Sequence, residues 1–304
     1  MQNPAALRPH PSAAHVHVLH RSTRDRHEPP HRRRFTAAIR AVLVLLLLSL
    51  TLMSSAGATE PNGCHRESFE HNAYIVCDFD PATGDLRLFW RDAHGEPYRQ
   101  FDRLADEIQA RGDTLQFALN AGMYTTDFVP VGLYIENGET LRRLNTRTID
   151  AAPARVPNFY KQPNGVFYLE HDHAGILTTA AYAEAGRSPR FATQSGPMLV
   201  IDNTLHPALI EGSTSVTRRS GVGVCRNGEV QFAISESLVN FHDFARLFRD
   251  QLKCPNALFL DGGRGAGIYS PALNRYDASW HGGYGPMFGV VASGSAEPSL
   301  TEKP

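Results

Sequence analysis

The sequence feature that most constrains the fold is a series of short β-prone runs, each bounded by turn residues. Beyond residue 110 these runs cover Leu115–Leu119, Leu133–Glu136, Leu141–Leu144, Val166–Glu170, Met198–Ile201, Gly221–Cys225, Val230–Ile234 and Ala257–Leu260. Asn137-Gly138 and Asn227-Gly228 stand between consecutive runs, and such dipeptides favour tight hairpins. The pattern predicts a single α+β domain with a long, mostly antiparallel or mixed sheet and a few packed helices.

Two segments have a helical spacing of apolar residues, and one further pair of runs has the pattern of a hairpin. Apolar residues recur three or four positions apart in Phe101–Ala110 and in Phe241–Leu252, which predicts an amphipathic helix in each. The runs Tyr74–Phe79 and Leu86–Trp90 are separated by Asp80–Asp85, a segment of turn residues. We therefore expect these two runs to pair with each other.

The N-terminal region has the three parts of a secretory signal in order. A basic, histidine-rich stretch precedes the apolar segment Ala41–Met53, and Ala56-Gly57-Ala58 follows with small residues at a cleavage-type spacing. The apolar segment is shorter than the roughly 20 residues that a membrane span requires. We predict a signal peptide with an extended basic leader over residues 1–58, a domain over 59–292 and a loose tail over 293–304. The alternative is an uncleaved anchor, the one case in which we expect membrane association.

Cleavage of this leader makes the protein acidic. Residues 1–58 hold 8 arginines and 2 acidic residues, so 22 basic and 29 acidic residues remain. An acidic chain is a poor candidate for binding nucleic acid, because that affinity comes chiefly from neutralising phosphates. The predicted signal peptide indicates a location outside the cytoplasm, periplasmic or secreted. With nucleic acid disfavoured by the charge, the expected partner is a small molecule or an envelope glycan.

All four cysteines, Cys64, Cys77, Cys225 and Cys254, follow the predicted signal. An even number of cysteines in an oxidising compartment predicts disulfides. Three pairings exist, and we prefer Cys64 with Cys77 and Cys225 with Cys254, because each closes a short loop between segments expected to be adjacent. Neither pair has the spacing of a zinc site.

Glycine and polar residues cluster directly after several predicted strands, where loops usually carry function. The clusters are Asn120–Tyr124, Pro163–Phe167, Gln194–Pro197, Arg218–Gly223 and Leu260–Gly263. Asp261 follows four apolar residues, so its carboxylate is expected at the end of a buried strand, where it needs a partner or a function. Glu236 follows the run Val230–Ile234 in a similar way. The two carboxylates are candidates for glycosidic chemistry, and the alternative for each is a structural role in a turn.

Three further motifs bear on possible chemistry. Arg218 and Arg219 are candidates for clamping a phosphate or carboxylate, and Arg264 for a third anion contact or an ion pair with Asp261. Ser195 lacks the first glycine of a serine-hydrolase elbow. His171-Asp172-His173 has no third ligand spaced nearby, so we expect neither a metal nor a cofactor.

In this order the clusters resemble the phosphodiester glycosidase family, over roughly residues 72 to 292. The segments that carry the resemblance are Arg219–Gly223, Ser195–Leu199 and Leu260–Gly263. The chain departs from the family after Gly263, where many members continue with glycine and serine and this one has Arg264-Gly265-Ala266. We therefore expect its choice of substrate to differ.

The resemblance implies an exported glycosidase that releases an N-acetylglucosamine-like sugar from a phosphate ester. It implies Asp261 as the leading catalytic carboxylate, Glu236 as its partner and Arg219 as the phosphate clamp. The substrate-binding residues implied are Asn120, Tyr124, Asn164, Ser195, Gly196, Arg218, Gly262 and Gly263. A non-catalytic glycan-binding protein and a metal-dependent phosphodiesterase are the alternatives.

Overall fold

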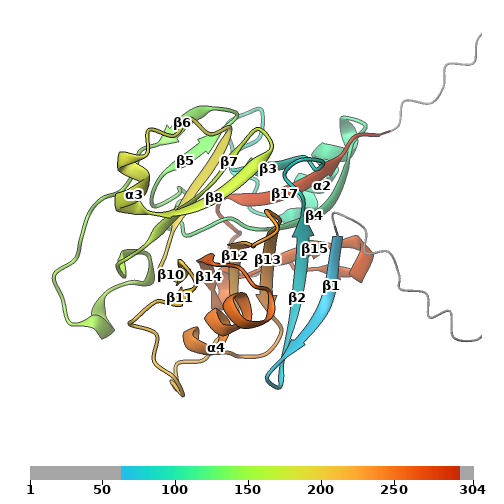
Figure 1. Cartoon of the computed structure of the whole chain (residues 1–304). Coiled ribbons are helices and arrows are strands. Elements are labelled where there is room, and N and C mark those ends of the chain that lie inside the picture. The colour runs from blue at the N-terminus through green and yellow to red at the C-terminus, as the bar shows by residue number, and fades with distance from the viewer. Residues whose placement is uncertain (1–62, 295–304) are drawn as a thin grey trace, which may run out of the picture. The chain divides into compact units, whose positions relative to one another are not determined.

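The strands of the computed structural model, which describes residues 63–294, form three sheets in which every strand pair is antiparallel (Figure 1). This arrangement confirms the predicted α+β class. The predicted signal peptide over residues 1–58 lies outside the described residues, as does the predicted tail beyond residue 294. Within residues 63–294 no helix has the length and apolar character needed to cross a membrane.

Each sheet combines strands from distant parts of the chain. In spatial order, sheet A contains β1 (Gly63–Phe69), β2 (Asn72–Phe79), β13 (Val230–Ser235), β12 (Arg219–Val224), β14 (Asn256–Gly262), β10 (Met198–Ile201) and β11 (Thr204–Leu205). Sheet B contains β16 (Arg275–Tyr276), β15 (Ile268–Ser270), β4 (Thr114–Asn120), β17 (Met287–Ala292) and β3 (Leu86–Phe89). Sheet C contains β6 (Glu139–Arg142), β5 (Tyr134–Glu136), β9 (Phe191–Ser195), β7 (Gly165–Glu170) and β8 (His173–Thr178).

The helices are short and form where local sequence supports them. Helix α2 (Phe101–Ala110) has the predicted bounds and buries one apolar face. Helix α3 (Thr179–Glu184) is capped by Thr178, whose hydroxyl accepts a hydrogen bond from the N–H of Ala181. The second predicted helix is α4 (Phe241–Arg246), which continues as the π-helical turn η3 (Leu247–Gln251). The described residues also contain four short 3₁₀ turns: η1 (Pro153–Arg155), η2 (Asn158–Tyr160), η4 (Gly263–Gly265) and η5 (Pro271–Leu273).

The main core lies where the three sheets face one another. Phe232 of sheet A, Phe288 of sheet B and Phe167 of sheet C are fully buried, and the ring of Phe288 lies 4.8 Å from that of Phe232 and 5.3 Å from that of Phe167. On its other face sheet A is covered by α4 (Figure 1). A Cβ at Gly223 would lie 2.8 Å from Phe248, so glycine permits this close packing. The two faces of sheet A therefore have different neighbours.

One expected pairing is wrong. The runs ending at Phe79 and beginning at Leu86 do not form a hairpin, because β2 pairs with β1 and β13 in sheet A whereas β3 pairs with β17 in sheet B. The physical reason is burial on both faces of β2, where Tyr74, Ile75, Val76 and Cys77 are fully buried, so the strand needs a partner along each edge. The segment Asp80–Asp85 is a turn, as expected, but it connects two sheets.

The other predicted strands are confirmed, with ends that differ by at most two residues. Both Asn-Gly hairpins are also confirmed, and the β5–β6 turn has positive φ angles of 51° at Asn137 and 81° at Gly138, as a tight hairpin turn requires. Strands with weak or interrupted patterns were not predicted, and these are β1, β8, β9, β11, β15, β16 and β17.

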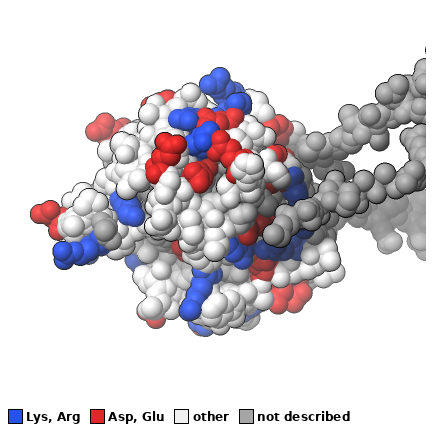
Figure 2. All heavy atoms as spheres, turned by 90° about the horizontal axis from the view of Figure 1, so that it is seen from below, with Lys and Arg blue, Asp and Glu red and all other residues white. Residues whose placement is uncertain are grey.

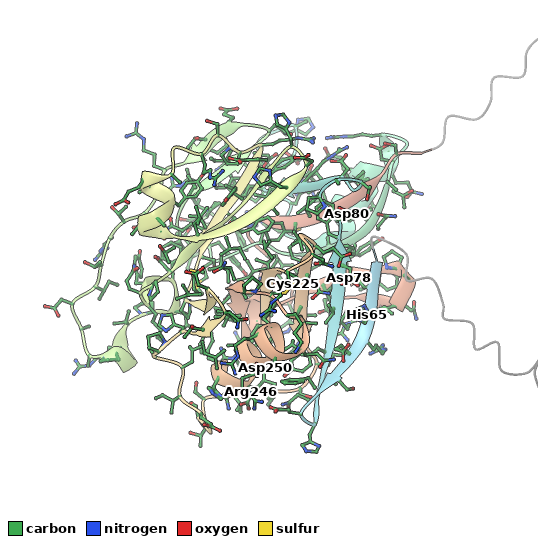
Figure 3. All side chains as sticks on the ribbon, viewed as in Figure 1. His65, Asp78, Asp80, Cys225, Arg246 and Asp250 are labelled. Carbon is green, nitrogen blue, oxygen red and sulfur yellow. A yellow bond between two sulfur atoms is a disulfide. The ribbon has the colours of Figure 1, made fainter. Side chains whose placement is uncertain are left out.

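Both disulfides join neighbouring segments of sheet A or of the chain packed on it. Cys64 pairs with Cys77 across β1 and β2, and Cys225, which follows β12, pairs with Cys254, which precedes β14. This is the pairing preferred from the sequence. In Figure 3, His65 on β1 lies beside Asp78 on β2, and a His65 Nδ1 to Asp78 Oδ2 distance of 3.3 Å adds a second tie between these strands. Two disulfides are typical of proteins made for an oxidising compartment.

Charged side chains of both signs are interspersed on the face shown in Figure 2. Near α4, Arg246 lies 2.6 Å from Glu70 and 3.0 Å from Asp250, and Asp250 also lies 2.6 Å from Arg249. Such alternation leaves no extended surface of one charge on this face.

Candidate active site

The carboxylate of Asp261 is re-aimed by a β-bulge at the end of β14. Ser220 is the register partner of Asp261 and Gly221 that of Phe259, so Leu260 is the extra residue. Bulges of this kind interrupt the alternation of side chains along a strand. The hydroxyl of Ser220 donates to the carbonyl of Asp261 at 3.1 Å, and that of Ser195 donates to the carbonyl of Leu260 at 2.9 Å. Two buried serines thus hold the bulge in place.

The surroundings of Asp261 favour its protonated form. Burial raises the pKa of Asp261 to about 7, and one hydrogen bond, from the N–H of Gly262 to Oδ1 at 2.7 Å, opposes this rise. No charged neighbour among residues 63–294 contributes to the shift. A Cβ at Gly265 would lie 2.1 Å from Oδ2 of Asp261, so a glycine is required in that place. The residue as a whole is only half-buried.

Tyr124 and His281 form the neighbouring part of the site. The hydroxyl of Tyr124 lies 3.1 Å from Nε2 of His281 and donates to the carbonyl of Gly283 at 3.0 Å. Nδ1 of His281 lies 2.9 Å from the hydroxyl of Ser279. Burial raises the pKa of Tyr124, with a further rise from the nearby charge of Asp261, and burial lowers the pKa of His281. Both groups are therefore neutral near pH 7.

Among residues 63–294, two buried asparagines each have one amide atom engaged and one without a partner. Oδ1 of Asn120 accepts from the N–H of Gly267 at 3.2 Å, while its Nδ2 has no partner. Nδ2 of Asn164 donates to the carbonyl of Phe159 at 2.8 Å, while its Oδ1 has no partner. A buried polar atom without a partner is costly, so these atoms are candidates for ligand contacts.

The clusters of sheets A, B and C approach one another closely at glycine residues. A Cβ at Gly122 would lie 3.7 Å from Cβ of Ser195, and one at Gly196 would lie 2.6 Å from Cβ of Asn164. The hydroxyl of Ser195 is hydrogen-bonded to the carbonyl of Leu260, which precedes Asp261, Gly262 and Gly263 at the end of β14. These contacts therefore connect the segments Asn120–Tyr124, Asn164 and Ser195-Gly196 to that strand end. Most of the residues expected at the site are therefore assembled at one place.

Arg219 lies on the opposite face of sheet A from Asp261. It precedes Ser220 in β12, and consecutive strand residues point to opposite faces. Its guanidinium lies 3.7 Å from the ring centre of Phe241 in α4 and donates to the carbonyls of Val239 and Ser215. Burial lowers the pKa of Arg219 to about 10. The structure does not bring this arginine onto the face of Asp261.

Glu236 and Arg218 belong to a chain of ion pairs. The two oxygens of Glu236 accept from Arg66 at 2.8 Å and from Arg275 at 2.9 Å. Arg275 also binds Asp277, which in turn accepts from Arg218 at 3.0 Å. Both oxygens of Glu236 are thus occupied, and Glu236 makes no contribution to the pKa of Asp261. The expected carboxylate pair is not assembled.

A cavity of about 430 Å³ borders the segment after Asp261. Its lining includes Arg218, Gly263, Arg264, Trp280 and His281. A larger hollow of about 700 Å³, beside β6, contains none of the residues predicted for the site.

Within residues 63–294 no cluster of three or more histidine, cysteine or acidic side chains is arranged to hold a metal ion. The histidines at 171 and 173 lie in and after the turn between β7 and β8.

Sequence reasoning missed the segment from Ser279 to Pro286. Its pattern, S-W-H-G-G-Y-G-P, combines glycines with polar and aromatic residues as the predicted clusters do. The segment follows no predicted strand, so its position in the sequence does not mark it as part of a site. The positive φ angles of Gly282 and Gly283, 109° and 140°, let this segment turn back toward Tyr124.

The chain is similar to known proteins over most of its described length. The phosphodiester glycosidase family model matches residues 113–290, more than half of the chain. A protein of Escherichia coli (strain K12), "Uncharacterized protein YigE", is 33% identical over 218 residues, which cover 71% of this chain and 82% of that protein.

Among solved structures, the catalytic domain of zebrafish N-acetylglucosamine-1-phosphodiester alpha-N-acetylglucosaminidase, auto-inhibited by its pro-peptide, has a TM-score of 0.52 at 13% identity. The match covers 78% of this chain and 85% of that one, and at this identity it shows a shared fold. The family model spans the clusters from Asn120 to Gly263 and the glycine-rich segment that reaches Tyr124. The chain therefore belongs to the phosphodiester glycosidase family, a family of hydrolases.

Proposed function

We propose that the protein is an exported glycosidase that hydrolyses a sugar-1-phosphodiester, with an N-acetylglucosamine-like sugar on the anomeric side. The observation that carries this proposal is the half-buried Asp261, with its raised pKa, on a strand end that Ser195 and Gly196 connect to a cluster with two buried asparagines. Each asparagine has one amide atom without a partner among the described residues. Family membership supports the reaction class, and the zebrafish relative in fold acts on a phosphodiester of N-acetylglucosamine. The two disulfides support export, to the periplasm or beyond the cell.

The chemistry requires only one carboxylate at the reacting carbon. Breaking the bond between the anomeric carbon and the phosphate oxygen leaves a phosphate monoester, which is stable as an anion and needs no proton from a general acid. Asp261 in its ionised form either takes a proton from the attacking water, or attacks the carbon itself and forms a glycosyl ester. In the second case water then attacks the anomeric carbon, breaks the ester bond and frees the carboxylate of Asp261. In both cases the oxygen of water ends on the sugar and the bonding electrons leave with the phosphate. Glu236 is engaged in ion pairs with Arg66 and Arg275, and a reaction that uses one carboxylate does not need it.

The sugar is held by groups that have hydrogen-bonding capacity left. Nδ2 of Asn120 is a donor and Oδ1 of Asn164 is an acceptor, and both are buried. An acetamido group offers one carbonyl and one N–H, which match such a donor and acceptor. Tyr124, neutral and close to Asp261, forms the adjacent wall. Ser195 and Gly196 act by holding Leu260 and Asn164 in position rather than by touching the sugar.

The phosphate is bound on the side of Arg264 and Arg218. Both arginines line the cavity that begins at Gly263, directly after the site. Arg264 is exposed, and no ion pair among the described residues occupies its guanidinium. Two parallel N–H donors of a guanidinium match two phosphate oxygens. We assign this role to Arg264 in place of Arg219, which lies across the sheet.

The test is hydrolysis of the methyl ester of N-acetylglucosamine 1-phosphate in oxygen-18 water by the full chain. We expect the label in the sugar, and Asp261→Asn to lower kcat by at least about a thousandfold, because it removes the base or nucleophile. Glu236→Gln is the matched control, and we expect it to lower kcat less than about fivefold.

Three outcomes would contradict the proposal. Label in the phosphate would indicate a phosphodiesterase that cuts the phosphorus-oxygen bond. Absence of turnover together with measurable binding would indicate a glycan-binding protein. Equal effects of the two substitutions would show that Asp261 has no special role.

A further inference from the structure

The hollow of about 700 Å³ beside β6 is lined by the end of that strand and by the segment that follows it. Its lining consists of Val131 and residues 141–147, and three of these residues are arginines, Arg142, Arg143 and Arg147. No aspartate or glutamate among residues 63–294 lines it. We call it the arginine hollow. It shares no lining residue with the cavity beside the proposed catalytic site, so the two are separate.

The three arginines of the hollow have no carboxylate partner. All three are exposed, and none of them forms an ion pair with another described residue. The guanidinium of Arg147 lies 5.9 Å from the ring centre of Tyr160. By contrast, Arg246 and Arg249 near α4 both contact the carboxylate of Asp250. Because acidic residues outnumber basic ones after residue 58, three unpaired arginines around one hollow are a distinct local excess of positive charge.

The segment that carries these arginines is held in place by Asn145, although it continues beyond the end of β6. The N–H of Asn145 donates to Oε1 of Gln194 at 2.9 Å, and its carbonyl accepts from Nε2 of Gln194 at 2.8 Å. The side chain of Asn145 donates to the carbonyl of Val131 and accepts from the N–H of Arg147, both at 3.1 Å. Gln194 itself is only 2% exposed. A segment fixed in this way loses less conformational entropy when a ligand binds.

The charge and the size of the hollow match a ligand with more than one phosphate. Two parallel N–H donors of a guanidinium pair with two phosphate oxygens. One phosphate monoester carries about −1.5 to −2 charges at pH 7, so a single group does not neutralise three arginines, whereas two groups do. The volume is within the range of about 300–1,000 Å³ that small-molecule sites occupy.

Protection of a sheet edge is the simpler explanation for exposed arginines. Strand β6 is the outer strand of sheet C (Figure 1), and charged side chains on such a strand discourage pairing with another chain. This explanation suits Arg142, the last residue of β6. It does not cover Arg143 and Arg147, which follow the strand and line the hollow.

We propose that the arginine hollow is a binding site for a ligand that carries two phosphate groups, either free in solution or as the headgroup of a lipid. The inference goes beyond the proposed function, because it uses none of the residues assigned to hydrolysis. Arg143 and Arg147 are the principal contacts, and Asn145 is a positioning residue between them.

Calorimetric titration of the full chain with pyrophosphate and with orthophosphate tests the site. We expect pyrophosphate to bind at least about tenfold more tightly than orthophosphate at low ionic strength, where attraction between exposed charges is screened least. Arg143→Ala and Arg147→Ala should each weaken pyrophosphate binding about tenfold, because each removes a bidentate contact. Their melting temperatures should stay within about 1 °C of wild type, since both side chains are exposed.

Two control variants locate the bound pyrophosphate. Arg226→Ala removes an exposed arginine outside the hollow and should leave the affinity unchanged. Arg264→Ala should also leave it unchanged. If Arg264→Ala weakens binding while Arg143→Ala does not, pyrophosphate occupies the cavity beside the proposed catalytic site and the inference is wrong.

Vesicle flotation distinguishes the two sources of the ligand. Phosphatidylcholine vesicles are prepared with cardiolipin, which has two phosphates per molecule, or with phosphatidylglycerol at the same phosphate content. A preference for cardiolipin that is lost in Arg143→Ala assigns a lipid headgroup, and equal capture together with tight pyrophosphate binding assigns a soluble ligand. The inference is overturned if neither diphosphate probe is preferred over its monophosphate counterpart, or if both preferences survive in the double variant Arg143→Ala with Arg147→Ala.

Discussion

The hydroxyl of Tyr124 lies 3.1 Å from Nε2 of His281, which joins the first glycine-rich cluster of the chain to the last. Because the same hydroxyl donates to the carbonyl of Gly283, the imidazole is the donor in the Tyr124–His281 contact, with Nδ1 accepting from Ser279. This network determines the tautomer of His281 and positions one wall of the site.

Tyr124→Phe removes the centre of this network. We expect a melting temperature about 2–8 °C lower, because loss of the hydroxyl leaves a buried carbonyl and an imidazole N–H without partners, at a cost of about 1–3 kcal/mol. Differential scanning calorimetry measures the change. Tyr276→Phe, whose side chain is 56% exposed, is the control and should melt within about 1 °C of wild type. Equal melting temperatures of both variants would show that the network is not formed.

The pH dependence of hydrolysis should follow the ionisation of Asp261. The pKa of Asp261 is raised to about 7, and the proposed role needs the ionised form. We therefore expect kcat/KM to rise with pH through about 7 and to fall about tenfold for each unit below it. Activity that instead falls as pH rises through 7 would assign Asp261 the role of a proton donor.

Asp261→Asn should stabilise the fold above neutral pH. Because the pKa of Asp261 is higher in the folded protein than in the unfolded chain, the folded state binds more protons between about pH 4 and pH 7, and wild-type stability falls across that window as pH rises. At about 1.36 kcal/mol per unit the full effect is about 4 kcal/mol, and we expect about half because Asp261 as a whole is only half-buried. Thermal melts at pH 4 and pH 8 measure it. The variant should exceed wild type by about 4–8 °C at pH 8 and match it at pH 4.

Substitution of Arg264 should change KM and leave the melting temperature unchanged, whereas substitution of Arg219 should lower the melting temperature with little change in KM. Arg264→Ala removes the exposed guanidinium that we propose as the phosphate contact, so KM should rise about tenfold with an unchanged melting temperature. Arg219→Ala leaves the carbonyls of Val239 and Ser215 without their donor and opens a gap beside Phe241, so the melting temperature should fall by several degrees. Its KM should stay within about threefold of wild type. A large rise in KM for Arg219→Ala at unchanged stability would restore Arg219 as the phosphate clamp.

Local signals account for most of the elements that were predicted correctly. Helix α2 has the bounds expected from the spacing of Phe101, Leu104 and Ile108, and the β5–β6 hairpin follows from Asn137-Gly138. The end of a buried strand at Asp261 follows from the unbroken apolar run before it. Each of these depends on residues within one turn or one strand, so no distant partner is needed to recognise it.

The features that were not predicted depend on strand pairs and ion pairs between segments distant in the chain. The turn after Phe79 carries no information about which sheet the next strand joins, and β1 was needed as the partner of β2. Glu236 and Asp261 follow strands in similar ways, yet Arg66 and Arg275 occupy the oxygens of Glu236 while Asp261 has no cationic partner among the described residues.

The sequence by itself therefore determined the fold class, the family and the strand end that carries Asp261, because periodicity, turn chemistry and motif order are properties of neighbouring residues. Only the tertiary structure decided which way that carboxylate points, through the bulge opposite Ser220. It also brought His281 to Tyr124 and Trp280 to Arg264 from segments distant in the chain. The physical reason is that register, burial and charge pairing are set between strands, which no single segment encodes.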